Sequence, residues 1–434
     1  MFTPIRRTIL IICLTLLLFT IALEIFKSVF PLPWKVRPFT LHSRYIFDAD
    51  VGRWHQPNSV ASHYGACYAV DEVRFNSFGM RDKERSKKKD KFRIAIFGDS
   101  MIEGAHVKDE QTVNRVIEDL LKGKVECLNF GISGFGTGQE YVLYEKKAKE
   151  FNPDLVIVGF FAKNDVRDNS LVLRSRMLKE ANQRTPDNVP FFGLDSHGNL
   201  TLIHNPELNP AKPAPPQPPS PKITFFQQVI NALKFRFPRV FGLVNNLEIF
   251  SAINFYCNSY YDKMLIRTAR NLKWSLNLGE TRNVDEIIGW HTSVYATDPP
   301  RAWQEAWEIT EKILLHWNND CKKNGAKLVV VTLPYDFELQ LDIKKEYFLY
   351  TGFYPLQNLD MSYPHRRIED FCQKNNIIGK SFLPEFFKYR DDHKLSNPPF
   401  MGYKCDGHYA PHGHRYLAEC IVKFLIDNQL IPLN

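Results

Sequence analysis

Four short, mainly apolar runs constrain the fold of this chain more than any other feature of its sequence. Strands without polar alternation are buried on both faces, which is typical of a parallel sheet covered by helices on both sides. Helical patterns separate these runs, and parallel strands need such crossover connections. The sequence therefore predicts an α/β fold, a doubly wound parallel sheet in three α/β/α layers. The four predicted strands are Arg93–Phe97, Val125–Asn129, Asp154–Phe161 and Lys327–Leu333.

Amphipathic stretches supply the helices of this expected fold. Between the first two strands, apolar residues recur at positions 113, 116, 117, 120 and 121, the spacing of one helix face. A fifth, short strand is expected near Ile377. The other predicted helices cover 139–151, 301–323, 366–374 and 413–427.

A long insertion interrupts the alternation of strands and helices. Within it, Pro206–Pro221 holds eight prolines in sixteen residues and predicts a stiff, extended connector. The apolar helical face of Phe225–Phe237 follows; we expect it to pack on the main domain, with a lid or membrane contact as the alternative. The predicted organisation is an anchor at 1–34, an irregular segment at 35–90, half of the α/β domain at 91–169, the insertion at 170–290, and the other half at 291–434.

The N-terminus predicts a membrane anchor. Thr8–Leu23 carries no charge, and Arg6 and Arg7 precede it. A spanning helix takes about 20 apolar residues, which the segment approaches when it is counted through Phe26. A cleaved signal peptide is the alternative, although only Thr20–Ala22 approaches a small-x-small cleavage site. We expect a single-pass protein of the cell membrane with its larger part outside the cytoplasm.

Composition excludes several classes of protein. Hydrophobic residues make up 44% and charged residues 24%, which is ordinary for a globular chain. A net charge of +8 over 434 residues is a mild excess, and no nucleic-acid-binding motif accompanies it, so no nucleic-acid partner is expected. The eight cysteines form no CxxC pair and no zinc-ligand spacing, and they do not resemble a disulfide framework.

Polar residues and glycines stand where the predicted strands end. Ser100 follows the first strand, Gly134 the second and Asn164 the third, while Asp406 and His408 precede the last helix. Each of these short motifs is, by itself, more commonly a turn or a helix cap. Because ligands of doubly wound sheets bind beyond the carboxyl ends of the strands, their common placement predicts one site.

These blocks resemble those of the SGNH (GDSL-type) hydrolase superfamily. The matching positions lie within 91–170 and 291–434; the N-terminal segment and the insertion are not covered. The family's last block usually has Asp three residues before His, whereas here the spacing is two, as in the alginate O-acetyltransferase-like branch. The residues that carry the resemblance are Gly98-Asp99-Ser100 with Gly104, then Gly134, Asn164, and Asp406 with His408.

The resemblance implies a role for each of five residues. Ser100 would be the nucleophile, His408 the general base, and Asp406 the carboxylate that orients the imidazole. The backbone N–H groups of Ser100 and Gly134 and the side chain of Asn164 would form the oxyanion hole. Neither a metal nor an organic cofactor is implied.

Three functions follow from these expectations. The first is a membrane-anchored serine esterase that cleaves an O-acyl ester on an envelope carbohydrate or lipid. The second is an O-acyltransferase with the same triad, which would need a membrane partner to supply the acyl donor. The third is a non-catalytic factor that binds or assembles polysaccharide.

The run Arg74–Arg81 also resembles membrane-anchored members of the superfamily, but we expect Asn76 and Arg81 to hold a turn and a loop.

Overall fold

The structure is a computed structural model. It describes residue 15 and the ranges 45–64, 68–180, 189–203, 293–339, 359–395, 400–403 and 407–432. Apart from residue 15, these belong to one compact unit, Leu41–Lys212 with Glu280–Asn434. Four predictions fall outside the described residues: the N-terminal anchor, the proline-rich connector, the helical face at 225–237, and Asp406. Within the described part of the chain, no helix has the length and hydrophobicity to span a bilayer.

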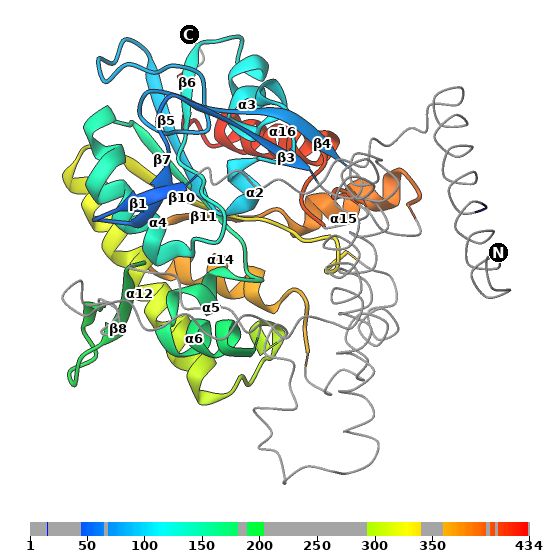
Figure 1. Ribbon diagram of the computed structural model, residues 1–434. Coiled ribbons are helices and arrows are strands. Elements are labelled where there is room, and N and C mark those ends of the chain that lie inside the picture. The colour runs from blue at the N-terminus through cyan, green and yellow to red at the C-terminus, as the bar shows by residue number, and fades with distance from the viewer. Residues whose placement is uncertain are drawn as a thin grey trace, which may run out of the picture. The chain divides into compact units, whose positions relative to one another are not determined.

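A five-stranded parallel sheet forms the centre of this unit (Figure 1). The strand order is β11-β10-β7-β5-β6. Along the chain, β5 therefore comes first, β6 is added on one side of it, and the remaining strands are added in turn on the other side. This order is one of the two common arrangements of doubly wound folds. The predicted parallel α/β sheet is confirmed. Its strands are β5 (Phe92–Gly98), β6 (Val125–Asn129), β7 (Leu155–Phe160), β10 (Lys327–Thr332) and β11 (Ile378–Ser381).

Helices cover both faces of the sheet, which explains why the strands are apolar throughout. Ile94 and Ile96 of β5 belong to one hydrophobic cluster, whereas Ala95 and Phe97 point into the other. Figure 1 shows α3 and α16 on one side of the sheet and α12 and α14 on the other. These helices are α3 (Val113–Leu120), α12 (Arg301–Lys323), α14 (Tyr363–Lys374) and α16 (Pro411–Asp427).

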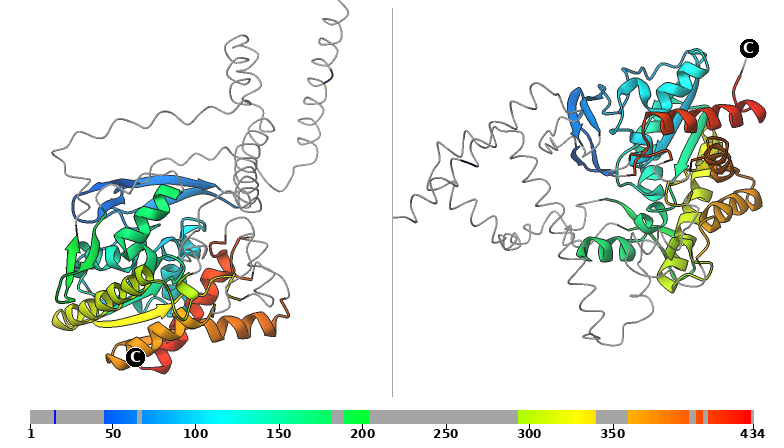
Figure 2. Two further views of the ribbon diagram at one scale, coloured as in Figure 1. Left: turned by 90° about the horizontal axis from the view of Figure 1, so that it is seen from below. Right: turned by 90° about the vertical axis from the view of Figure 1, so that its right-hand side faces the viewer.

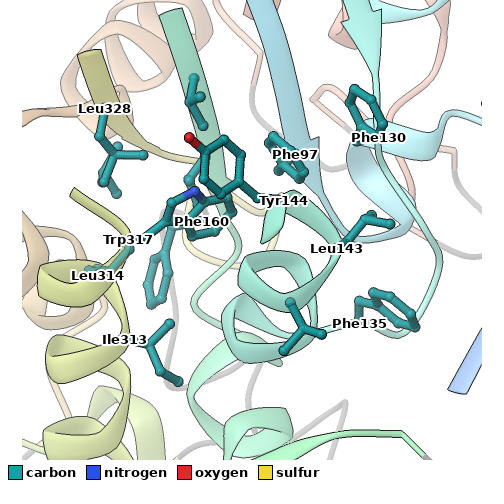
Figure 3. Close-up of a cluster of buried hydrophobic side chains, with 14 of the residues drawn as sticks. Phe97, Phe130, Phe135, Leu143, Tyr144, Phe160, Ile313, Leu314, Trp317 and Leu328 are labelled. Carbon is teal, nitrogen blue, oxygen red and sulfur yellow. The ribbon is translucent and has the colours of Figure 1, made fainter. Parts of the chain in front are cut away.

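Large aromatic side chains fill the cluster beneath α12. Trp317 of this helix packs its ring against Phe97 at a centroid distance of 5.1 Å, and both side chains are fully buried (Figure 3). Tyr144 completes the group from the chain after β6. The helix predicted at 139–151 is shorter in the structure: α4 (Thr137–Leu143) is followed by a π-helical turn to residue 148 and a 3₁₀ turn to residue 151.

The segment at 35–90, predicted to be irregular, contains two antiparallel strand pairs. In both views of Figure 2 these blue strands lie along one side of the α/β domain. Their sequences are short and mix apolar with polar residues, so tertiary packing decides the pairing. His55 is fully buried, and Trp54 belongs to the core cluster that also holds Phe135. The strands are β1 (Tyr45–Asp48), β2 (Gly52–His55), β3 (Ser59–Tyr64) and β4 (Ala69–Phe75).

Smaller elements complete the described unit. One helix ends just before the predicted insertion, a helix and a hairpin lie in its first part, and one helix follows the last strand of the sheet. Their bounds are α5 (Asp165–Asn169), α6 (Leu171–Glu180), β8 (Phe191–Leu194), β9 (Leu200–Ile203) and α15 (Leu383–Asp392).

Candidate active site

Ser100 stands beyond the carboxyl end of strand β5, which lies between β7 and β6, and it begins the short helix α2 (Ser100–Glu103). Asp99 caps this helix, since its Oδ1 accepts the N–H of Met101 at 2.8 Å. The tight turn also explains Gly98, because a Cβ there would come within 2.3 Å of Ile102. Ser100 is half-buried at the edge of the sheet.

His408 meets Ser100 although 308 residues separate them along the chain. Its Nε2 lies 2.8 Å from the Ser100 Oγ, the distance of a good O–H···N hydrogen bond. The backbone around His408 is held by its neighbours: its carbonyl accepts the N–H of Tyr403, and Tyr403 accepts the N–H of Gly407. The expected serine–histidine contact is therefore present, and its geometry suits proton transfer.

The other two histidines near the start of α16 point elsewhere. His412 is exposed, and its Nε2 lies 3.0 Å from the carbonyl oxygen of Phe400. His414 is buried, and this burial lowers its pKa to about 3, so its imidazole is neutral near pH 7. Only His408 of the three contacts Ser100.

A histidine that the sequence analysis missed lies against His408. The rings of His106 and His408 are stacked with centroids 3.8 Å apart and planes at 13°. His63 and Tyr68 contact His106 from the N-terminal strands, and Tyr403 donates its hydroxyl proton to the His106 carbonyl at 3.0 Å. His106 belongs to no block of the resemblance, so only the tertiary structure reveals this contact.

Gly134 lies in the loop after β6, beside the helix that Ser100 begins. Its φ of +72° is in the left-handed region that glycine adopts most readily. The preceding residue, Ser133, donates its N–H to Glu103 Oε2 at 2.6 Å, which ties this loop to α2. No described residue accepts the N–H of Gly134, and Ser100 N–H, at the first helical position, has no acceptor within α2.

Asn164 approaches Ser100 from the next strand end. It precedes α5, and its Nδ2 donates to Asp99 Oδ2 at 2.7 Å. An amide nitrogen carries two protons, so this bond leaves one for a second acceptor. Asn164 thus contacts the residue before Ser100, and the loop of Gly134 is tied to the helix that Ser100 begins, whereas Asp406 lies outside the described residues.

Three buried carboxyl groups lie behind these donors. Burial raises the pKa of Glu140 and of Asp165 well above the ordinary value, and it raises the pKa of Asp99 as well. Neither carboxyl oxygen of Glu140 has a hydrogen-bond partner among the described residues. Asp99 and Asp165 have structural roles, since each accepts a backbone N–H group of its own turn.

Asn76 and Arg81 make the structural contacts that the sequence analysis expects. Asn76 Oδ1 accepts the N–H groups of Phe78 and Met80, each at 3.0 Å, and so closes a turn. Arg81 donates to the carbonyl of Val107 at 3.0 Å and pairs with Asp109, which holds the loop after α2.

In the described part of the chain, no three His, Cys, Asp or Glu side chains are arranged to hold a metal ion.

Comparisons with known proteins complete this description. No protein-family model matches the chain, and no curated protein matches it. Among solved structures, an acetyl xylan esterase is similar with a TM-score of 0.36 and 12% identity, covering 77% of this chain and 99% of that chain. A catalytic mutant of an acetylxylan esterase from Geobacillus stearothermophilus has a TM-score of 0.35 and 11% identity over 78% and 95%. A GDSL-like lipase from Bacteroides thetaiotaomicron has a TM-score of 0.32 and 10% identity over 78% and 89%.

Proposed function

We propose that this protein is a serine esterase that cleaves an O-acyl ester through an acyl-enzyme. The observation that carries the proposal is the 2.8 Å contact between Ser100 Oγ and His408 Nε2. A serine hydroxyl becomes a competent nucleophile when a base within about 2.6–3.2 Å takes its proton. His408 is then the base, and Asp406, two residues earlier, is the carboxylate that fixes the imidazole tautomer.

The reaction follows in two halves. Ser100 Oγ attacks the ester carbonyl carbon while its proton passes to His408 Nε2. The tetrahedral intermediate collapses, the bond to the alcohol oxygen breaks, and His408 returns the proton to that oxygen. Water then attacks the acyl-enzyme with the same base and releases the carboxylic acid. The N–H groups of Ser100 and Gly134 and the Asn164 amide stabilise both oxyanions.

The proposed substrate is an acylated carbohydrate or lipid of the cell envelope. An N-terminal single-pass anchor at residues 8–26 would hold the catalytic domain at the outer side of the membrane. O-acyl transfer to a polysaccharide is the second candidate, because a sugar hydroxyl can replace water in the second half-reaction. The two-residue spacing of Asp406 and His408 favours this candidate, which requires a partner that supplies the acyl donor.

Two substitutions test the nucleophile and the base. Ser100→Ala and His408→Ala are expected to lower turnover of a chromogenic acetyl ester by about 10⁴-fold or more, because triad members act as a unit. Ser100→Ala is also expected to lose labelling by a fluorophosphonate probe. The matched controls are Ser86→Ala and His412→Ala, two exposed residues whose loss leaves turnover unchanged. Undiminished turnover in Ser100→Ala would contradict the proposal.

A second experiment separates the candidate functions. Acyl release from a purified, labelled acyl-enzyme is measured with and without polysaccharide. Release that is independent of polysaccharide supports the esterase, and release that needs it, with acyl groups recovered on the sugar, supports the transferase. A wild-type protein that binds polysaccharide but is never labelled at Ser100 would instead be a non-catalytic factor.

A further inference from the structure

Charged side chains bind two successive peptide groups at Ser133: Glu103 binds the one that precedes it, and Arg53 binds the one that joins it to Gly134. Arg53 of strand β2 donates from Nη2 to the carbonyl oxygen of Ser133. In a trans peptide, the form that nearly all non-proline residues adopt, the C=O and N–H groups point in opposite directions. Arg53 therefore lies behind the peptide whose N–H, on Gly134, is the proposed oxyanion donor.

Glu103 fixes the other side of Ser133. Its Oε2 accepts both the N–H of Ser133, at 2.6 Å, and the Ser133 hydroxyl. The same oxygen accepts the hydroxyl proton of Tyr45 at 3.0 Å, and the carboxylate is fully buried. Because Glu103 ends the helix that Ser100 begins, it sets the Ser133 loop relative to the nucleophile.

Arg53 also fills the space against Gly134. A Cβ at Gly134 would come within 2.8 Å of Arg53 Nη2, so the guanidinium packs directly on the glycine. The rings of Tyr45 and Phe135 lie 5.1 Å and 5.5 Å from the guanidinium carbon and limit its movement. The cation is thus fixed at the loop by packing as well as by its hydrogen bond.

We propose that Arg53 is a positioning residue for the oxyanion hole. A cation at the Ser133 carbonyl oxygen polarises the peptide and makes the Gly134 N–H a stronger donor. The effect grows in the transition state, where full negative charge develops opposite that N–H. Glu103, which accepts the N–H and the hydroxyl of Ser133, holds the residue whose carbonyl Arg53 binds. The inference rests on the proposed esterase function and adds the N-terminal strand pair to its machinery.

Arg53→Met removes the cation and preserves most of the side-chain volume. Loss of a whole oxyanion donor costs about 10²–10³ in kcat, so weakening one donor is expected to lower kcat by about tenfold. KM should change by less than about twofold, since the ground state gains little from this donor. Arg53→Lys, which keeps the charge, is expected to recover most of the lost kcat.

Lys147→Met is the matched control. Lys147 pairs with Asp48 of β1 at 2.7 Å, so this variant also removes a cation that holds the N-terminal strands. If Arg53 merely attached these strands, both variants would change activity alike. We expect normal kcat in Lys147→Met and a lowered kcat only in Arg53→Met.

The possible outcomes separate the inference from the proposed function. Unchanged kcat in a folded Arg53→Met would overturn the role of Arg53, while Ser100-dependent turnover would leave the esterase proposal intact. If Arg53→Met does not fold, Arg53→Gln replaces it, because glutamine keeps a neutral donor in place of the cation, and the same fall in kcat is expected. Wild-type kcat in Arg53→Gln would overturn the inference. Turnover that survives Ser100→Ala would overturn the proposed function itself.

Discussion

At the scale of single residues, the ring of His106 constrains the proposed base. Stacking at 3.8 Å leaves the His408 imidazole little freedom to rotate away from Ser100. Orientation matters because a displacement of about 1 Å between reacting groups can cost two orders of magnitude in rate. Because His106 stacks on His408, we expect it to act as a positioning residue for the proposed base.

Replacing His106 tests this constraint. His106→Ala is expected to lower kcat by about tenfold, since the His408 ring loses the surface against which it lies. His106→Phe keeps an aromatic ring and should retain most of the activity. His393→Ala is the control: it removes a similar stack on Tyr389, at a centroid distance of 4.0 Å, and should leave ester turnover unchanged. Equal activity of the Ala and wild-type proteins would exclude a positioning role.

At the scale of elements, one carboxylate holds the segment that pairs with the loop of His408. Asp336 follows β10, and its two oxygens accept the N–H groups of Met401 and Gly402, each at 2.8 Å. Gly402 in turn forms a β-bridge with Tyr409, the residue after His408. Asp336, which lies in the turn after β10, thereby helps to set the position of the His408 imidazole.

Asp336→Ala is expected to weaken both the fold and the site. Two buried N–H groups lose their acceptor, which lowers the free energy of unfolding by about 1–3 kcal/mol for each group, so the Tm should fall by several degrees. Turnover at a temperature well below the new Tm should also fall, because His408 is less well held. Asp392→Ala, which breaks only an exposed pair with Lys388, should change neither quantity. A lowered Tm with undiminished turnover would separate this contact from catalysis.

At the scale of the whole molecule, one histidine buried beside a hydrophobic cluster ties the stability of the fold to pH. His414 is buried next to the cluster around α16, where burial and the nearby His408 and Arg81 lower its pKa to about 3 from 6.5. Below pH 6.5 the unfolded chain binds a proton here that the folded chain does not bind. Stability therefore falls as the pH decreases from 6.5 towards 3.

The expected slope is about 1.4 kcal/mol per pH unit from this residue. His414→Phe should remove this pH dependence. The free energy of unfolding, measured with urea at pH 6.5 and 5.0, should then differ less in the variant than in the wild type. The comparison is between the changes in unfolding free energy with pH. A packing defect that lowers stability equally at both pH values does not alter that change. His412→Phe, at an exposed position, should keep the wild-type slope. Identical slopes in all three proteins would contradict the assignment.

Much of the fold was predictable because burial on both faces leaves a local signature. The strand Val125–Asn129 and the helix Arg301–Lys323 have the predicted bounds, since each is defined by the pattern of its own apolar residues. The strand pairs β1–β2 and β3–β4 were not predicted, because their few buried side chains are interspersed with polar ones. Short strands of this kind depend on the surface against which they pack.

The amino-acid pattern alone was enough to predict a parallel α/β sheet, because strands buried on both faces are apolar throughout. The set Ser100, His408, Asp406, Gly134 and Asn164 came from the resemblance to a known superfamily and stays a prediction. Only the tertiary structure decided that His408 lies 2.8 Å from Ser100, that His106 stacks on it, and that Arg53 and Glu103 hold the loop of Gly134. These contacts join residues far apart in the chain or outside any periodic pattern. Their partners are set by packing, which local sequence does not encode.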